Sequence, residues 1–215
     1  MPQPFTAVYA VQWHGITAGY STLELRRTGP VTFLYTSRIR AAGIFRLAFP
    51  DVAEQTSSFE LRDGHVVPLS YEERNGAGKK AEDVTLNFDW NAHRVTGQTG
   101  EHPVNHPLEP GTQDPLSVQI ELMDDLRGGK APASFVLFDK RDSTRYNYTA
   151  EGSVRVDTAL GTLATILYRS DRPGSDQVTR LWLAPSLGYT PVRGQRIRHG
   201  KVDFSLQIRA LTHPA

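Results

Sequence analysis

The sequence predicts an all-β protein: one large, curved antiparallel sheet with one or two short helices. Apolar and polar residues alternate with a period of two over most of the chain, which is the pattern of half-buried strands. Turn residues separate these segments at short intervals, so consecutive strands should be antiparallel neighbours. About eleven such segments, with further pieces near the C-terminus, are too many for a flat sheet, which must therefore curl or close.

The alternation is clearest in residues 81–90, whose apolar residues share one face while polar residues share the other. Glycine-containing pairs such as Asp63-Gly64, Asn75-Gly76 and His199-Gly200 mark turns. The expected strands, in chain order, are residues 5–13, 18–27, 31–40, 54–62, 66–74, 81–90, 94–100, 133–140, 143–158, 162–170, 176–184, 190–198 and 201–212.

The alternation breaks after residue 113, and a helix is expected near residues 114–127. Asp114 stands where an N-cap is expected, and Pro115 occupies the first helical position. Apolar residues then recur at helical spacing until a pair of glycines ends the run. This segment is therefore interpreted as a helix inserted between two groups of strands.

Two other segments also depart from the strand pattern. In residues 41–51 the apolar side chains fit helical spacing better than alternation, and Pro50 ends the run. Residues 101–113 contain three prolines and show no periodicity, so they are expected to form a long loop that leads to the helix.

Length and charge limit the possible functions. The 215 residues carry 24 basic and 23 acidic side chains, interleaved along the chain. No nucleic-acid partner is expected, because nucleic-acid binding needs a clustered basic face. A chain of this length suits one β domain over residues 1–215. The absence of cysteine excludes disulfides, thiolate metal sites and cysteine nucleophiles.

No transmembrane segment is expected. The mean hydropathy is −0.41, and no apolar run approaches the roughly 18 residues that a membrane-spanning helix requires. A transmembrane barrel is not expected either, because the likely outer faces carry Arg26, Asp83, Asp203 and Arg209. The N-terminus MPQPF lacks a basic stretch followed by an apolar core, so any secretory signal has been removed or never existed.

No motif indicates an enzyme. The chain contains neither a G-x-S-x-G nucleophile elbow nor a phosphate-binding loop. The passage from Trp182 to Arg193 lacks a nucleophile with a base in reach, and we interpret it as a structural corner between strands. We therefore expect no catalytic residues and no cofactor.

One loop contains residues that could bind a metal. His102 and His106, with Glu101, could ligate zinc if another histidine lay close in space. Prolines beside both histidines prevent the helix that would place them on one face. A solvated loop is the preferred interpretation, and no metal site is expected.

Aromatic side chains on the expected inner faces form the main candidate site. A packed core is one interpretation of this set. A curved sheet of this size is hard to fill with its own side chains, however, so the aromatic face is also a candidate apolar binding groove. The residues of this candidate groove are Tyr9, Trp13, Phe33, Tyr35, Phe88, Trp90 and Phe204.

Three short motifs resemble the DUF3108 family of bacterial exported proteins of unknown function. They lie near the start, the centre and the end of the chain. The motifs are Tyr9-x-Val11-x-Trp13-x-Gly15-Ile16-x-x-Gly19, then Asp114-Pro115-Leu116-Ser117, and then Trp182-Leu183-Ala184 to Pro191-Val192-Arg193 with Gly200.

The resemblance implies a location and a fold. Members of that family usually carry a signal peptide, which implies a periplasmic mature protein, and they offer no established catalytic residues. The strand count and the inserted helix are also similar to the LolA/LolB-type lipoprotein carriers, whose open half-barrel holds acyl chains beneath short helices. A closed, lipocalin-like barrel is the alternative.

These observations favour a non-enzymatic periplasmic protein that binds a lipid, an acyl chain or a lipoprotein segment on a concave aromatic face. The alternative is a cell-envelope scaffold that binds a protein partner and has no ligand cavity. A metal-dependent hydrolase using the loop around His102 and His106 is the least favoured hypothesis.

Overall fold

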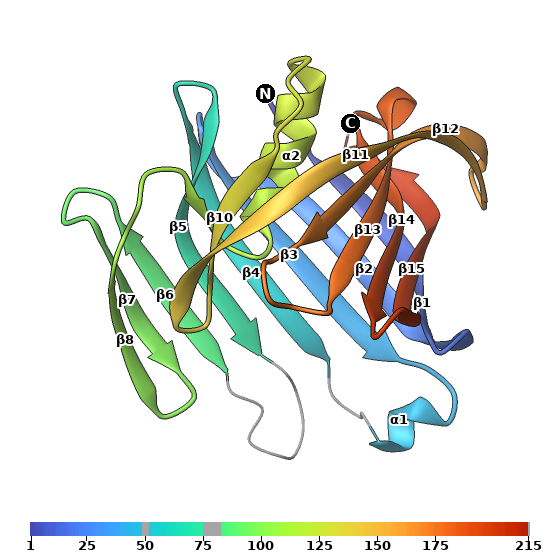
Figure 1. The fold of residues 1–215 in the computed structure, drawn as a ribbon, viewed down its shortest axis with the longest axis horizontal. Coiled ribbons are helices and arrows are strands. Elements are labelled where there is room, and N and C mark those ends of the chain that lie inside the picture. Colours follow the sequence, from blue (N-terminus) through green and yellow to red (C-terminus); the bar gives the residue numbers. More distant parts are fainter. Residues whose placement is uncertain (49–51, 75–82, 215) are drawn as a thin grey trace.

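The computed structural model describes residues 1–48, 52–74 and 83–214. It contains fifteen strands in one sheet, two α-helices and one short 3-10 helix, η1 (Figure 1). The strands are β1 (Phe5–Trp13), β2 (Ile16–Arg27), β3 (Thr32–Ala41), β4 (Ala53–Arg62), β5 (His65–Arg74), β6 (Val84–Asp89), β7 (Arg94–Thr99), β8 (His102–Pro107), β9 (Thr112–Gln113), β10 (Ser134–Asp139), β11 (Asp142–Thr158), β12 (Gly161–Asp171), β13 (Val178–Ala184), β14 (Thr190–Arg198) and β15 (Lys201–Thr212). The helices are α1 (Phe45–Ala48), α2 (Ser117–Arg127) and η1 (Pro185–Leu187).

The sheet is a meander with one long-range junction. Its order is β8-β7-β6-β5-β4-β3-β2-β1-β15-β14-β13-β12-β11-β10-β9. The first and last long strands therefore lie side by side, and β1 and β15 pair antiparallel. All pairs are antiparallel except the short parallel pair of β9 and β10. The all-β fold expected from the alternation is confirmed.

The sheet curls but does not close. Strands β8 and β9 stand at the two ends of the order, so the closed barrel that was the alternative expectation is not formed. Side chains join the two ends instead. Thr99 Oγ1 donates to the Lys140 carbonyl at 2.7 Å, Gln113 Nε2 donates to the Val66 carbonyl at 2.8 Å, and Phe88 meets Phe138 edge-on.

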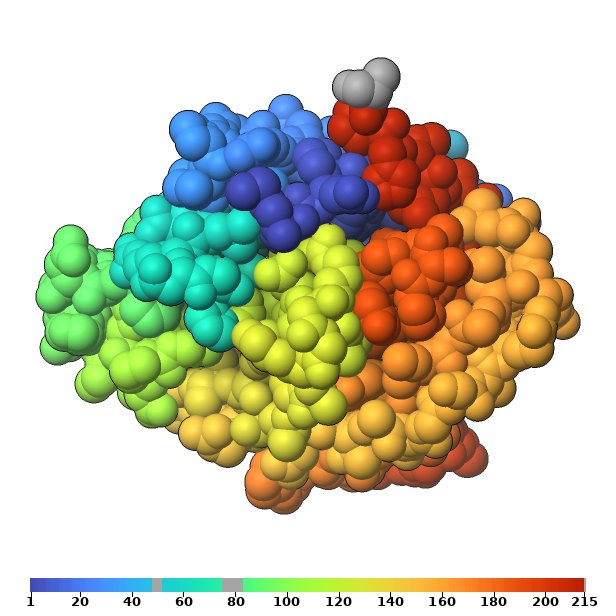
Figure 2. All heavy atoms as spheres, turned by 90° about the horizontal axis from the view of Figure 1, so that it is seen from above, coloured from blue at the N-terminus to red at the C-terminus, as the bar shows by residue number. Residues whose placement is uncertain are grey.

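Helix α2 fills the upper end of the curled sheet. Figure 2 shows its residues between the cyan β4–β5 hairpin and the orange residues near η1. One side of α2, including Ile120, packs into the main core. Another side, including Leu122, packs against β10, β12 and β13 in a second cluster with Leu183. The helix thus links the N-terminal and C-terminal halves of the sheet.

The segment of residues 101–113 differs from the expected loop. It contains strands β8 and β9, and β8 pairs antiparallel with β7. Pro103 and Pro107 lack the N–H that a central strand needs, but β8 is an edge strand, where a missing donor is tolerated. The expectation of a loop was wrong because it treated the prolines as excluding any strand.

The other expected elements lie close to their predicted positions. The helical spacing of residues 41–51 corresponds to the single turn α1, while Pro50 lies outside the described residues. Residues 75–82, with the expected Asn75-Gly76 turn and the start of the strand predicted at 81–90, also lie outside them. The expected corner is η1, and Gly188 follows it in the left-handed conformation at φ 62°. No helix in the described part of the chain is long and apolar enough to cross a membrane.

Candidate ligand cavity

A cavity of about 320 Å³ lies between α2 and the inner faces of β1, β2 and β10–β15. Most of its wall is apolar. Leu181 and Val118 face it from β13 and α2, and β15 contributes two side chains. The apolar lining residues are Tyr9, Leu23, Pro115, Val118, Leu137, Leu181, Pro191, Phe204 and Leu206, together with Gly194. We call this space the α2 cavity.

The polar groups of the α2 cavity come from α2 and from strands β10–β14. Besides Tyr146 and Tyr148 of β11, they are Gln119, Asp139, Ser170, Thr179, Gln195 and Arg196. Burial raises the pKa of Tyr148 to about 12, and a hydrogen bond with Ser170 opposes this shift. Tyr148 therefore stays neutral and offers a hydroxyl to a ligand over the physiological pH range.

A smaller polar pocket of about 220 Å³ adjoins the α2 cavity and shares Asp139 and Tyr146 with it. The other lining groups come from the β12–β13 connection and the end of β14. They are Arg172, Ser175, Gln177 and Arg198. The two spaces together form an apolar compartment with a charged extension.

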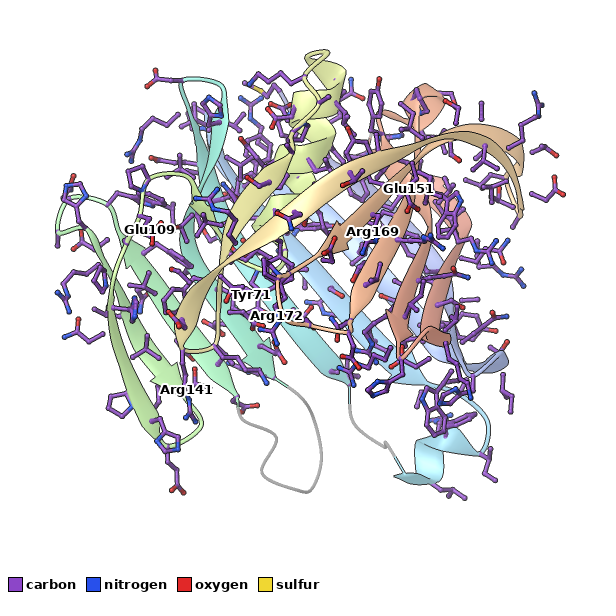
Figure 3. The ribbon with its side chains drawn as sticks, in the orientation of Figure 1. Tyr71, Glu109, Arg141, Glu151, Arg169 and Arg172 are labelled. Carbon is purple, nitrogen blue, oxygen red and sulfur yellow. The ribbon has the colours of Figure 1, made fainter. Side chains whose placement is uncertain are left out.

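Asp139 is the acidic group where the two spaces meet. Burial raises its pKa, the charge of Glu73 raises it further, and the charges of Lys140 and Arg172 lower it. Figure 3 labels Arg172, which lines the polar pocket, and Tyr71, a buried residue of β5. Tyr71 donates a 2.8 Å hydrogen bond to Glu73 Oε2. The polar end of the site therefore contains charges of both signs.

Asp114 fixes the start of α2 beside the cavity. Its Oδ1 accepts hydrogen bonds from the backbone N–H groups of Leu116 and Ser117, both at 2.8 Å. The backbone N–H of Asp114 in turn donates to Ser117 Oγ at 2.9 Å, which completes a reciprocal cap. The helical hydrogen-bond pattern begins at Ser117, but the cap is Asp114, as the sequence predicts.

A second anchor lies about two turns further along the chain, at Glu121 of α2. Glu121 Oε2 accepts the Val66 backbone N–H at 2.7 Å, and Glu121 Oε1 lies 2.9 Å from His65 Nδ1. Burial raises the pKa of Glu121, while the hydrogen bonds from His65 and Val66 lower it. These contacts hold α2 against the β4–β5 hairpin and so set one wall of the cavity.

The histidines considered for zinc are not brought together. His106 Nε2 lies 3.5 Å from Asp142 Oδ1, and His102 is exposed on the edge strand. In the described part of the chain, one group of three possible ligands lies within 4.8 Å, namely His65, Glu121 and Asp125. Its members already have partners, since Lys130 Nζ lies 3.0 Å from Asp125 Oδ1.

The seven aromatic residues of the candidate groove occupy four environments. Tyr9 and Phe204 line the α2 cavity. Three others are buried core residues, namely Phe33, Tyr35 and Phe88. Trp90 is half-buried, and its Nε1 donates to the Pro68 carbonyl at 2.6 Å. Trp13 is 50% exposed at the end of β1, outside the cavity.

Several lining residues were not singled out from the sequence. Leu181 and Gly194 lie on strands that the sequence predicts, and Gln119 lies on the predicted helix. Alternation assigns these residues to faces, but it does not show which part of a face lacks a packing partner. Tyr146 and Tyr148 are the lining residues that the sequence indicates best, because two tyrosines at alternate positions share one face of β11.

Comparison with known proteins agrees with this architecture. The chain is similar to a crystal structure titled as a beta-barrel-like protein of domain of unknown function DUF1849 from Brucella abortus, at 12% identity and a TM-score of 0.62, covering 99% of this chain and 98% of that one. At this identity the likeness shows the fold alone. No curated protein matches significantly.

The family match covers most of the chain. Residues 8–206 match DUF3108, described as a protein of unknown function. These residues run from β1 into β15 and include every strand and helix that contributes to the α2 cavity. The chain therefore belongs to the DUF3108 family.

Proposed function

We propose that this protein is a non-enzymatic periplasmic carrier that binds an apolar or amphipathic ligand in the α2 cavity. A lipid, an acyl chain or a lipoprotein segment has the required chemistry. The observation that carries the proposal is the 320 Å³ space left between α2 and the curled sheet. Ligand sites are commonly concave spaces of about this size with mostly apolar walls, and the α2 cavity has both features.

The lining supports a ligand with one apolar and one polar end. Ligand sites commonly measure about 300–1,000 Å³ and combine apolar walls with a few polar groups. Here Leu181 and Leu206 belong to the apolar walls, while Asp139 and Tyr146 mark the junction with the polar pocket. Burial of an acyl chain would contribute about 25 cal/mol per Å² of apolar surface, and the polar groups would fix its orientation.

The periplasmic location is part of the proposal and rests on the signal peptide that family members usually carry. The similarity of the strand count and the inserted helix to LolA/LolB-type carriers supports a lipid-like ligand, because the half-barrel of those carriers holds acyl chains. The competing hypothesis, an envelope scaffold, predicts a protein without a space for a ligand. The α2 cavity therefore favours the ligand-binding hypothesis over the scaffold.

Mass spectrometry of co-purifying lipids tests the proposal. The full chain, purified without detergent, is extracted with organic solvent, and the extract is compared with that of an unrelated protein from the same cells. We expect one or a few lipid species at a stoichiometry approaching one per chain. A clean extract, together with no binding of a fluorescent fatty acid to the purified protein, would overturn the proposal.

A further inference from the structure

A group of large apolar side chains is exposed at the end of the sheet opposite α2. We call it the rim patch and define it as Trp13, Ile16, Ile44, Leu47 and Val202. Leu47 is 87% exposed, Ile44 76% and Ile16 63%. Figure 1 shows α1, which contains Leu47, protruding at the lower end, away from α2 at the upper end.

The patch joins three chain segments that are distant in sequence. Trp13 and Ile16 face each other across the β1–β2 turn. The Trp13 ring meets the Phe45 ring of α1 edge-on, with centroids 6.1 Å apart. The backbone N–H of His14 donates to the Asp203 carbonyl at 3.1 Å, which places the start of β15 and Val202 beside the same turn. These contacts place α1, the β1–β2 turn and the start of β15 next to one another at this end of the sheet.

The two most exposed apolar side chains of the patch, Ile44 and Leu47, lie at α1. The backbone N–H of Leu47 donates to the Ile44 carbonyl at 3.1 Å, so these residues lie three apart on one turn and project from the same side. Scattered exposed leucines are normal, but a rim of contiguous large apolar residues marks a binding surface. Tryptophan favours the boundary between water and lipid, and Trp13 is half exposed here.

Cations without acidic partners surround the patch. Arg40, Arg46 and Lys201 are exposed, and within the described ranges none of the three forms an ion pair. Two described acids near the patch are already paired. Asp203 lies 3.2 Å from Arg196, and Asp176 is paired with His199. Among the described residues, the surface around the exposed apolar residues therefore carries more unpaired basic than unpaired acidic groups.

We propose that the rim patch docks the protein on a bilayer surface that carries anionic lipid headgroups. The apolar tips of Ile44 and Leu47 enter the boundary between headgroups and acyl chains, and Arg46 and Lys201 pair with the headgroups. A protruding single turn with an unpaired cationic surround suits this partner better than a protein groove, which would need complementary acids at defined positions. The inference does not depend on a ligand in the α2 cavity.

The rim patch lies next to one wall of the α2 cavity. Trp13 pairs across strands with Phe204 of β15, and Phe204 lines the α2 cavity. In a protein docked through the rim patch, Trp13 would touch the membrane, and its cross-strand neighbour Phe204 would be part of the cavity wall.

Vesicle co-sedimentation of the full chain tests the proposal. The probes are vesicles of phosphatidylcholine alone and vesicles that contain roughly one third phosphatidylglycerol. We expect wild-type protein to bind the anionic vesicles, and an Ile44→Asp/Leu47→Asp variant to bind more than about tenfold more weakly. Arg46→Gln and Lys201→Gln should each weaken binding to anionic vesicles by about fivefold.

Matched controls separate the patch from general effects. Leu160→Asp places the same charge on an exposed leucine in the β11–β12 turn, and Arg155→Gln removes an exposed cation from β11. Both should bind vesicles as the wild type does, with unchanged circular dichroism. Quenching of tryptophan fluorescence by brominated acyl chains should be strong in the wild type and weak in Trp13→Phe.

Two results would overturn the proposal. One is a wild-type protein that binds neither kind of vesicle at excess lipid. The other is a folded Ile44→Asp/Leu47→Asp variant that binds anionic vesicles like the wild type. A wild-type dimer in sedimentation velocity that the same variant dissociates, without vesicle binding, would assign the rim patch to a second copy of the chain instead.

Discussion

The hydroxyl of Ser57 donates a 2.6 Å hydrogen bond to Oδ2 of Asp114, and both residues are fully buried. This contact joins β4, in the N-terminal half of the sheet, to the residue that caps α2. The other carboxylate oxygen accepts the two backbone N–H groups of the cap. One side chain thus determines where α2 begins and where the helix sits in the curled sheet.

Replacement of Asp114 by alanine should destabilise the protein by about 1–3 kcal/mol at pH 7. The substitution removes the cap and leaves the Ser57 hydroxyl and the two N–H groups without their acceptors. Urea unfolding followed by circular dichroism measures the effect. Asp114→Asn keeps an oxygen acceptor for the cap, so at pH 7 it should be clearly more stable than Asp114→Ala. Equal losses in both variants would contradict the role assigned to the cap.

The same carboxyl predicts a pH dependence of stability. Burial raises the pKa of Asp114 to about 6, although its hydrogen bonds from Ser57, Ser117 and Leu116 act in the opposite direction. Because the folded pKa lies above the unfolded value, the folded state binds the proton more tightly. The resulting stability is fully present below about pH 4 and is lost as the pH rises through about 6.

The size of this effect can be isolated with Asp114→Asn. A shift of about two pKa units corresponds to about 3 kcal/mol, so the wild type should lose most of this stability relative to Asp114→Asn between pH 4 and pH 7. Urea unfolding of both proteins at several pH values gives the difference. A difference that does not change with pH would show that Asp114 titrates normally.

Much of the fold could be predicted from the sequence, because alternation reports directly which residues face the core. The strand expected at residues 5–13 has those bounds in the structure, and that expected at 190–198 does as well. Residues 102–107 could not be assigned in this way, because a strand with two prolines is stable only at an edge. Edge position depends on the topology of the whole sheet, which local patterns do not encode.

The site was less predictable than the fold. Alternation places Tyr9, Phe33 and Trp13 on inner faces, yet Phe33 stacks on Phe59 with ring centroids 5.4 Å apart while Tyr9 borders a cavity. Trp13 is the last residue of β1 and is half exposed. The difference arises from where α2 lies and how far each strand extends, and both are set by tertiary contacts such as Ser57 with Asp114.

Tyr9→Phe should destabilise the protein by about 1–2 kcal/mol. The Tyr9 hydroxyl donates a 2.8 Å hydrogen bond to the Pro191 carbonyl across the interior, and the phenylalanine variant leaves that buried carbonyl without its donor. Thermal unfolding by calorimetry gives the measurement. Tyr20→Phe removes a hydroxyl from a half-exposed ring of β2 and should have no measurable effect. If the two variants unfold alike, the Tyr9 hydrogen bond contributes nothing to stability.

Gly194→Leu should fill the α2 cavity without harming the fold. Gly194 lines the cavity, and a Cβ at this position would meet Leu181 at 3.5 Å and Leu206 at 3.8 Å, which are ordinary contacts. Glycine in a strand interior weakens the strand, so the variant should be as stable as the wild type or more stable. Its side chain occupies space that the proposed ligand needs, and affinity for a fluorescent fatty acid should fall by more than about tenfold.

Thr85→Leu provides the matched control for this experiment, because it adds a leucine at an exposed position of β6 between the buried Val84 and Leu86. Its affinity for the fluorescent fatty acid should equal that of the wild type. If Gly194→Leu folds and keeps wild-type affinity, the fatty acid binds elsewhere on the protein. If both variants lose affinity equally, binding depends on the sheet as a whole and the α2 cavity is not the specific site.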